Sequence, residues 1–204
     1  MYKKFGKRLL DLILTIPGLI LAIIIFIPVG ILIYLEDRGS VFYNADRLGK
    51  DGEVFKMYKF RSMKMNAPDL RKSDGSTFNS ENDSRLTKVG KVLRKTSIDE
   101  LPQLLNVIKG DMSLVGPRPD LPEHVSQYEG NEVRKLEVKP GITGYSQAYF
   151  RNSIKWKERI QNDIYYIDNI SLFLDIKIVY KTIVSVIKSN GIYTNIDSKE
   201  GKEV

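Results

Sequence analysis

Cysteine is absent from this 204-residue chain, and histidine occurs once, at His124. Without cysteine the chain can form neither disulfide bonds nor thiolate metal sites, which is compatible with a reducing compartment. A lone histidine also leaves too few nitrogen ligands for an ordinary zinc site. We expect His124 to be a surface residue. Any chemistry must therefore come from carboxylates, hydroxyls, amides and cations.

Basic residues are in excess over acidic ones. The chain has 32 Lys and Arg against 25 Asp and Glu, and past residue 37 the counts are 28 and 22. This excess favours phosphate-bearing partners, a class that includes anionic lipid headgroups, nucleotides and nucleic acids. The basic residues are dispersed and no nucleic-acid recognition motif occurs, so we do not expect a nucleic acid as a partner.

The longest uncharged run, residues 12–35, follows a basic start formed by Lys3, Lys4, Lys7 and Arg8. It is too long for the apolar core of a signal peptide and precedes no small-residue cleavage pattern, so we expect a retained membrane anchor. As one helix it would extend ~36 Å, enough to cross a ~30 Å hydrocarbon core. A plain spanning helix remains possible. Pro17 and Pro28 favour a re-entrant helix that bends back to the same face, with Pro28 as the break.

Two stretches rich in β-branched and aromatic residues, 40–43 and 54–60, flank a turn-like segment at 49–52. This pattern predicts a β-hairpin. Strand alternation would place Lys59 and Arg61 on one face about 7 Å apart. There the two cations would bracket a diphosphate, or they would lie solvated at a strand end.

Helical periodicity recurs in residues 86–95, 156–167 and 172–187, and the glycines and proline of residues 139–144 predict a tight loop. The expected fold is α/β: a re-entrant membrane helix and a small, mostly helical domain with a short β-hairpin. We divide the chain into an anchor at 1–37, a catalytic domain at 38–188 and a polar tail at 189–204.

Asp99 and Glu100 are the adjacent carboxylates on which the chemistry depends. Ser97, three residues before Glu100 and ahead of an apolar run, also fits a capping box, which would make the pair structural. Pro102 complicates that interpretation, because proline is tolerated only in the first turn of a helix. A helix that contains Pro102 in its first turn would start near Asp99. Carboxylates at such a start can hold Mg²⁺ against a diphosphate, and an ionised Asp can attack phosphorus.

Arg118 lies between Pro117 and Pro119, two residues of fixed φ. Arginine is the side chain best suited to bidentate phosphate contacts, so this segment is either a phosphate-binding loop or a rigid surface turn. Arg151, which follows Tyr149 and Phe150, is a weaker candidate for the same role.

These motifs occur in one order along the chain: the basic start with its apolar segment, residues 58–63, Arg94 through Asp99 and Glu100, and residues 110–113, 116–119 and 139–144. Together they resemble the bacterial sugar transferases, and within them the small monotopic polyprenyl-phosphate phosphoglycosyl transferases. The resemblance runs from about Tyr2 to Ser189. No single motif is decisive, but their order and spacing together are highly specific.

The resemblance implies an enzyme that transfers a sugar 1-phosphate from a UDP-sugar to undecaprenyl phosphate and releases UMP, an initiating step of bacterial glycan synthesis. It implies that Asp99 is the nucleophile, with Glu100 beside it, and that Mg²⁺ is required. Lys59, Arg94 and Arg118 fall on family positions that hold phosphate or nucleotide. The expected location is the bacterial inner membrane, with the catalytic domain on the cytoplasmic face.

Two further points qualify the resemblance. Members of the family usually break the anchor at Ser-Pro, whereas here Ile27 precedes Pro28, so the hydroxyl that would satisfy a freed carbonyl is missing. The alternative from another class of protein is a non-enzymatic, membrane-anchored basic adaptor that binds acidic partners or lipid.

Overall fold

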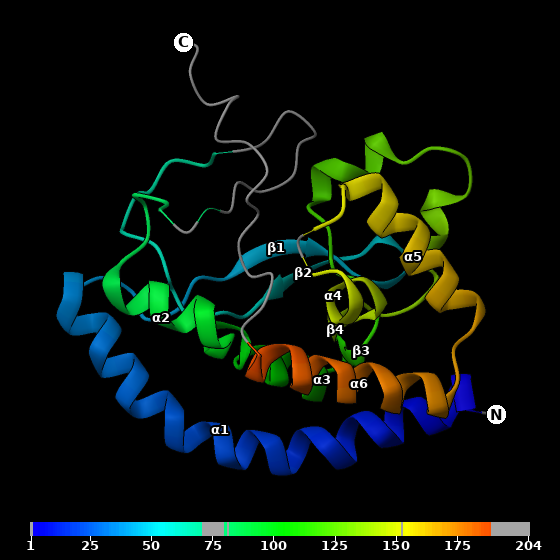
Figure 1. The fold of residues 1–204 in the computed structure, drawn as a ribbon, viewed down its shortest axis with the longest axis horizontal. Helices are drawn as coiled ribbons and strands as arrows, with labels where there is room; N and C mark the ends of the chain where they lie inside the picture. The colour runs from blue at the N-terminus through cyan, green and yellow to red at the C-terminus, as the bar shows by residue number, and fades with distance from the viewer. Residues whose placement is uncertain (1, 71–79, 81, 152, 189–204) are drawn as a thin grey trace.

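A single long helix underlies the molecule in the computed structural model, which describes residues 2–70, 80, 82–151 and 153–188. This helix, α1 (Lys7–Asp37), follows a π-helical turn at Tyr2–Gly6. Figure 1 shows it as an arc that runs beneath α3 (Gln103–Lys109) and α6 (Leu172–Ile187) and rises towards α2 (Lys88–Thr96). Helical backbone continues through Pro17 and Pro28. The predicted break at Pro28 is therefore wrong, because the bend is spread along the helix instead of being concentrated at one residue.

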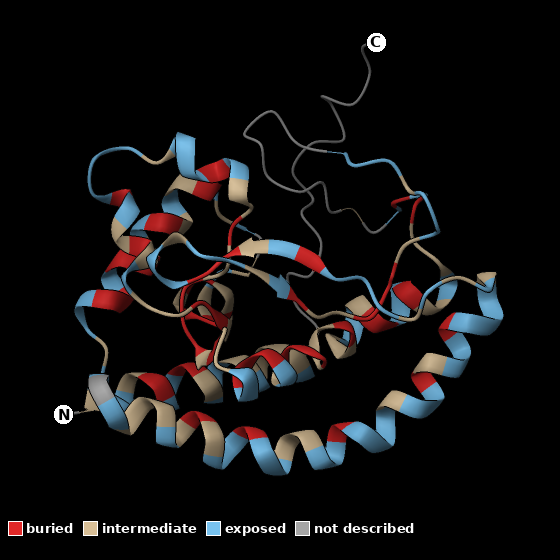
Figure 2. Cartoon of the chain, turned by 180° about the vertical axis from the view of Figure 1, so that it is seen from behind, coloured by how far each residue is buried: buried red, intermediate tan, exposed pale blue. Residues whose placement is uncertain are grey.

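One side of α1 packs on the domain and the other faces outwards. Thr15, Ala22, Val29 and Ile33 are buried on the inner side. Many large apolar side chains of the helix remain exposed, among them Ile13, Ile16, Ile20, Ile24, Ile27, Ile31 and Leu35, and Figure 2 shows exposed turns along the length of the helix. Length and composition make α1 a helix capable of crossing a membrane.

Polar contacts fasten the first end of α1 to the domain. Lys7 forms an ion pair of 2.8 Å with Asp175. The Asp11 carboxylate accepts hydrogen bonds of 2.9 Å from the Ser113 hydroxyl and the Leu114 amide. These partners come from distant parts of the chain, so the start of α1 is fixed to the domain by tertiary contacts.

The other end of α1 is fastened to the same domain. The Glu36 carboxylate accepts hydrogen bonds from the backbone amides of Lys88 and Val89, at 2.6 and 3.0 Å. Asp37 forms an ion pair with Arg61. Both ends of the apolar helix therefore lie against one domain.

The predicted hairpin is present, with its first strand shifted. Strand β1 (Ala45–Leu48) pairs antiparallel with β2 (Val54–Met57), with Leu48 opposite Val54 across the turn. The prediction of a strand at 40–43 is wrong, because the turn at Lys50–Gly52 brings residues 45–48 opposite β2. Residues 41–43 do pair with residues 59–61, through an isolated bridge between Phe42 and Phe60 and backbone hydrogen bonds from Tyr43 to Lys59 and from Arg61 to Val41.

The remaining elements form a helical layer around a second pair of strands (Figure 1). The helices are α2 (Lys88–Thr96), α3 (Gln103–Lys109), α4 (Tyr145–Tyr149), α5 (Trp156–Asp168) and α6 (Leu172–Ile187). Short 3₁₀ turns occur at Ile98–Glu100, Pro122–Gln127 and Gly130–Glu137. The periodicity predictions for α2, α5 and α6 are confirmed.

The second pair of strands, β3 (Ser113–Val115) and β4 (Gly141–Thr143), is parallel. The loop predicted at 139–144 therefore contains a strand. The two backbones touch at Gly116 and Gly141, where a Cβ added to Gly141 would lie 2.1 Å from the Gly116 amide nitrogen. The core beside this pair includes Val115, Tyr166, Ile167 and Ile178.

His124 is buried, so its prediction as a surface residue is wrong. Its ring packs 4.8 Å from the ring of Trp156. Beside it, the buried Lys135 forms ion pairs with Asp120 at 2.6 Å and with Asp163 at 3.1 Å. A long-range aromatic partner and a charged neighbour make burial favourable, and local sequence shows neither of them. The predicted tail at 189–204 lies outside the described residues.

Candidate active site

Asp99 and Glu100 lie on a short turn between two helices. Ser97, at φ 59°, ends α2, and its amide donates to the Arg94 carbonyl at 3.3 Å. The 3₁₀ turn Ile98–Glu100 follows, and α3 begins after Pro102. The Ser97 side chain makes no capping hydrogen bond to this turn, so the capping-box interpretation is wrong. The two carboxylates therefore lie on the turn that connects α2 and α3, and they do not cap a helix.

Asp99 is almost completely buried, at 2% exposure. Its carboxylate lies 2.8 Å from the Lys59 ammonium, and its backbone carbonyl accepts a 3.0 Å hydrogen bond from the Phe60 amide. Burial, the largest cause, raises the pKa of the Asp99 carboxyl above its ordinary value; Lys59 opposes the rise, and the Glu100 charge adds to it. A carboxylate with a raised pKa is more basic than an exposed one, which favours attack once it is ionised.

Glu100 is more open and is shared between two cations. Its carboxylate lies 3.4 Å from the Lys59 nitrogen and 3.7 Å from the Arg118 guanidinium. Burial alone would raise the pKa of Glu100, but Lys59 and Arg118 outweigh it and hold the pKa below its ordinary value. The two neighbouring acids are thus shifted in opposite directions, a pattern typical of paired carboxylates with different roles.

Arg94 reaches the dyad from the last turn of α2. Its Nε donates a 3.0 Å hydrogen bond to the Ser62 hydroxyl, and its charge lowers the pKa of both Asp99 and Glu100. Gly90 allows this approach, because a Cβ there would lie 1.9 Å from the Ser62 carbonyl oxygen. The sequence analysis missed Ser62, which has no local signal beyond its place after Arg61.

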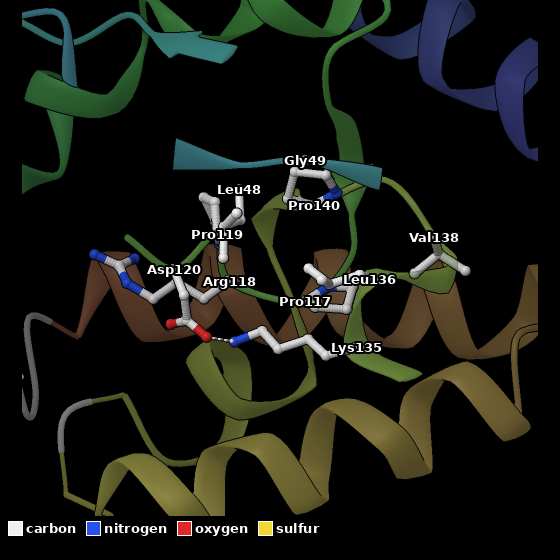
Figure 3. Close-up of a pocket in the computed structure, with 10 residues that line it drawn as sticks. All are labelled: Leu48, Gly49, Pro117, Arg118, Pro119, Asp120, Lys135, Leu136, Val138 and Pro140. Carbon is white, nitrogen blue, oxygen red and sulfur yellow. Dashed lines mark hydrogen bonds and ion pairs between the residues drawn. The ribbon is translucent and has the colours of Figure 1, made fainter. Parts of the chain in front are cut away.

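The segment that carries Arg118 is held rigidly from both sides. The Pro117 carbonyl accepts a 2.9 Å hydrogen bond from Gly141, at the start of β4. On the other side, Asp120 forms its buried ion pair with Lys135, drawn as a dashed line in Figure 3. The Arg118 side chain is itself 40% exposed. A fixed backbone thus presents a guanidinium that remains accessible to a ligand beside Glu100.

Arg151 approaches the same region from the end of α4. Its backbone is left-handed, at φ 49°, and its Nε donates a 2.6 Å hydrogen bond to the Ser185 hydroxyl on α6. Burial lowers the pKa of Arg151, and the charge of Glu100 opposes this effect. Arg151 therefore lies within electrostatic range of the dyad. Ser185 was missed because nothing in the periodicity of α6 marks it.

Arg61 is directed elsewhere. Its guanidinium binds Asp37 at the end of α1, and its Nη1 also donates to the Met63 carbonyl at 3.4 Å. Lys59 and Arg61 thus bind different carboxylates, so the structure does not support the predicted bracket around one diphosphate. Strand β2 ends at Met57, but antiparallel pairing resumes at Phe60, which bridges Phe42. The two side chains therefore differ in their partners.

Asp99 and Glu100 are the two adjacent carboxylates of this site to which a metal ion could bind. No group of three or more Asp, Glu, His or Cys side chains gathers as a metal site within residues 2–70, 80, 82–151 and 153–188. Protein-bound Mg²⁺ commonly uses only one or two carboxylates together with substrate phosphates and water. Two adjacent carboxylates beside several cations fit this arrangement.

The family model for bacterial sugar transferases matches residues 2–189. The chain is 45% identical to the uncharacterized sugar transferase EpsL of Bacillus subtilis over 91% of this chain and 89% of EpsL. It is 39% identical to the undecaprenyl-phosphate galactose phosphotransferase of Salmonella typhimurium, and 39% identical to the UDP-N-acetylgalactosamine-undecaprenyl-phosphate N-acetylgalactosaminephosphotransferase of Aeromonas hydrophila. It covers 42% and 45% of the lengths of these two proteins. The chain belongs to the bacterial sugar transferase family, and it is a transferase.

Proposed function

We propose that this enzyme transfers a sugar 1-phosphate from a UDP-sugar to undecaprenyl phosphate, releases UMP and proceeds through an aspartyl-phosphosugar intermediate. The observation that carries the proposal is the buried, cation-paired Asp99 beside Glu100. The names of the Salmonella and Aeromonas relatives support the same donor and acceptor classes. Because the family is one of transferases, we do not retain the non-enzymatic adaptor.

In the first step, an Asp99 oxygen attacks the phosphorus that bears the sugar. A bond forms between that oxygen and phosphorus, the bond from phosphorus to the bridging oxygen breaks, and UMP leaves with the electron pair. Lys59 orients the Asp99 carboxylate, and Arg118 and Arg94 are placed to offset the charge that builds on the diphosphate. Removing this charge repulsion is the main task, because both reactants are anions.

In the second step, an oxygen of the lipid phosphate attacks the same phosphorus. The acyl-phosphate bond breaks, the Asp99 carboxylate is released, and the product is a lipid-linked diphosphate sugar. Asp99 and Glu100 would hold Mg²⁺, which when bound would neutralise phosphate charge and align the leaving group. Arg118, Arg94 and Arg151 are the proposed phosphate or nucleotide contacts, with Pro117 setting the backbone of the first.

We also propose that α1 is a re-entrant anchor in the bacterial inner membrane, with the catalytic domain on the cytoplasmic face. The basic residues before α1 favour a cytoplasmic start by the positive-inside rule. The contacts of Asp11 and Asp37 with one domain support a cytoplasmic end as well. This arrangement keeps the active site in the compartment that supplies UDP-sugars.

Two experiments test the proposal together. The first scores a panel of UDP-sugars for UMP release with undecaprenyl phosphate and Mg²⁺ in detergent or nanodiscs. The second compares wild type with Asp99→Asn, which keeps the shape of the side chain and removes the anionic nucleophile. We expect background activity from the variant. In wild type, we expect one phosphosugar mass on the peptide that holds Asp99 when the acceptor is omitted. UMP release without any labelled peptide under rapid quench would refute the covalent intermediate.

A further inference from the structure

An apolar groove lies between the last third of α1 and the chain segment that follows it. It has a volume of about 430 Å³ and is lined from α1 by Phe26, Ile27, Ile31 and Tyr34, and from the following segment by Val41 and Phe42. That volume is in the range of ordinary small-molecule sites, roughly 300–1,000 Å³. Among the side chains that line the groove, only Tyr34 carries a polar atom. The groove therefore suits a hydrocarbon ligand.

The buried Phe60 lies between the groove wall and the residues that hold the proposed nucleophile. The Phe42 ring in its wall stacks on the Phe60 ring at 5.3 Å, and Phe26 packs on the edge of Phe60 at 5.1 Å. The Phe60 amide donates to the Asp99 carbonyl at 3.0 Å, and the preceding Lys59 binds the Asp99 carboxylate at 2.8 Å. One residue thus connects the apolar wall with the cation-lined phosphate region.

We propose that this groove binds the first isoprene units of the polyprenyl chain of the acceptor. The inference rests on the proposed function, which supplies a lipid phosphate as the second substrate. A phosphate beside Lys59 would lie one residue along the chain from Phe60, whose buried ring stacks on the groove wall at Phe42. The groove then offers branched and aromatic walls to the methyl-branched chain. Because Ile27 and Ile31 are also 66% and 53% exposed on the anchor, the rest of the chain can continue into surrounding lipid.

A matched pair of variants on neighbouring residues tests the site. Ile31 lines the groove and Leu32 does not, although both side chains are 53% exposed. Ile31→Trp should partly fill the groove, whereas Leu32→Trp adds the same bulk to the anchor outside it. For undecaprenyl phosphate, we expect Ile31→Trp to raise KM by about tenfold, a loss of about 1.4 kcal/mol. Leu32→Trp should match wild type.

The donor half-reaction separates this site from the chemistry. Formation of the phosphosugar-enzyme from UDP-sugar alone should be equal in wild type and both variants, since no lipid acceptor takes part. An equal rise of KM in both variants, or a slower donor half-reaction in Ile31→Trp, would overturn the groove assignment.

Photolabelling tests lipid binding in the groove without turnover, so this test remains valid even if the proposed reaction is wrong. A polyprenyl phosphate with a photoreactive group near its phosphate should label residues 26–42 in wild type, and undecaprenyl phosphate should compete with it. Ile31→Trp should lose this labelling and Leu32→Trp should keep it. If a photoreactive phosphatidylethanolamine labels residues 26–42 and the polyprenyl probe does not, bulk lipid occupies the groove and the proposal is wrong.

Discussion

Replacing Lys59 with methionine should move the acidic limb of the pH–rate profile to higher pH. Lys59 lies 2.8 Å from the Asp99 carboxylate, and Asp99 is 2% exposed, so little water can replace the lost cation. An opposite charge at such a distance favours the ionised carboxylate, so its removal should raise the pKa of Asp99 further above its ordinary value. Each pH unit by which the limb moves corresponds to about 1.4 kcal/mol of lost stabilisation of the carboxylate. Protonated Asp99 is not a nucleophile, so activity should be lost first at low pH and regained as the pH rises.

The assay is the single-turnover rate of phosphosugar-enzyme formation from about pH 5 to about pH 9. The plateau will also fall if Lys59 contacts phosphate, but the position of the limb reports the Asp99 proton separately. Lys56→Met is the matched control, because Lys56 forms an ion pair of the same length, 2.8 Å, with the exposed Asp46. A lowered plateau with an unmoved limb in Lys59→Met would refute Lys59 as the partner that keeps Asp99 ionised.

Three further outcomes follow from the same contacts. Arg118→Lys keeps the charge but loses the planar fork, so the KM for UDP-sugar should rise about tenfold or more at unchanged thermal stability; wild-type kinetics would assign the segment to structure. Ser185→Ala removes the hydroxyl to which the Arg151 guanidinium donates, so kcat/KM for the donor should fall about fivefold. Ser185→Thr restores a hydroxyl and should restore kcat/KM; if it does not, the hydroxyl does not position Arg151. Single cysteines at Lys4 and Val133 should both resist an impermeant thiol reagent in intact cells and react after lysis; labelling of position 133 alone before lysis would mean a spanning helix.

Local sequence predicted the elements whose formation depends on local pattern. Helices α5 and α6 have apolar residues at helical spacing over more than three turns, and the hairpin has a turn signal between two β-rich stretches. The parallel pair β3–β4 could not be predicted in this way. Its strands have three residues each, too few to show alternation, and residues 116–140 separate them in the sequence.

The candidate site was predicted mainly through the order of its motifs, and errors arose where a side chain has a distant partner. Ser97 matches a capping box in sequence, but Glu100 is drawn to Lys59 and Arg118, so the reciprocal bond back to Ser97 does not form. His124 is a similar case, because its burial depends on the ring of Trp156. Sequence spacing predicts the local structures that are open to a segment, such as a capping box at Ser97 or an exposed His124. The long-range contacts determine which of these structures forms.

Residues 59–61 connect the three parts of the proposed enzyme. Lys59 binds the Asp99 carboxylate, Phe60 stacks against the wall of the apolar groove, and Arg61 binds Asp37 at the end of α1. In a regular strand the first and third of these side chains would share one face, which is why they were assigned one role. Here Phe60 still pairs with Phe42, but the side chains on either side of it bind different carboxylates. The anchor contact and the nucleophile contact are two residues apart, so one short segment fixes the end of α1, the wall of the groove and the cation beside Asp99 relative to one another.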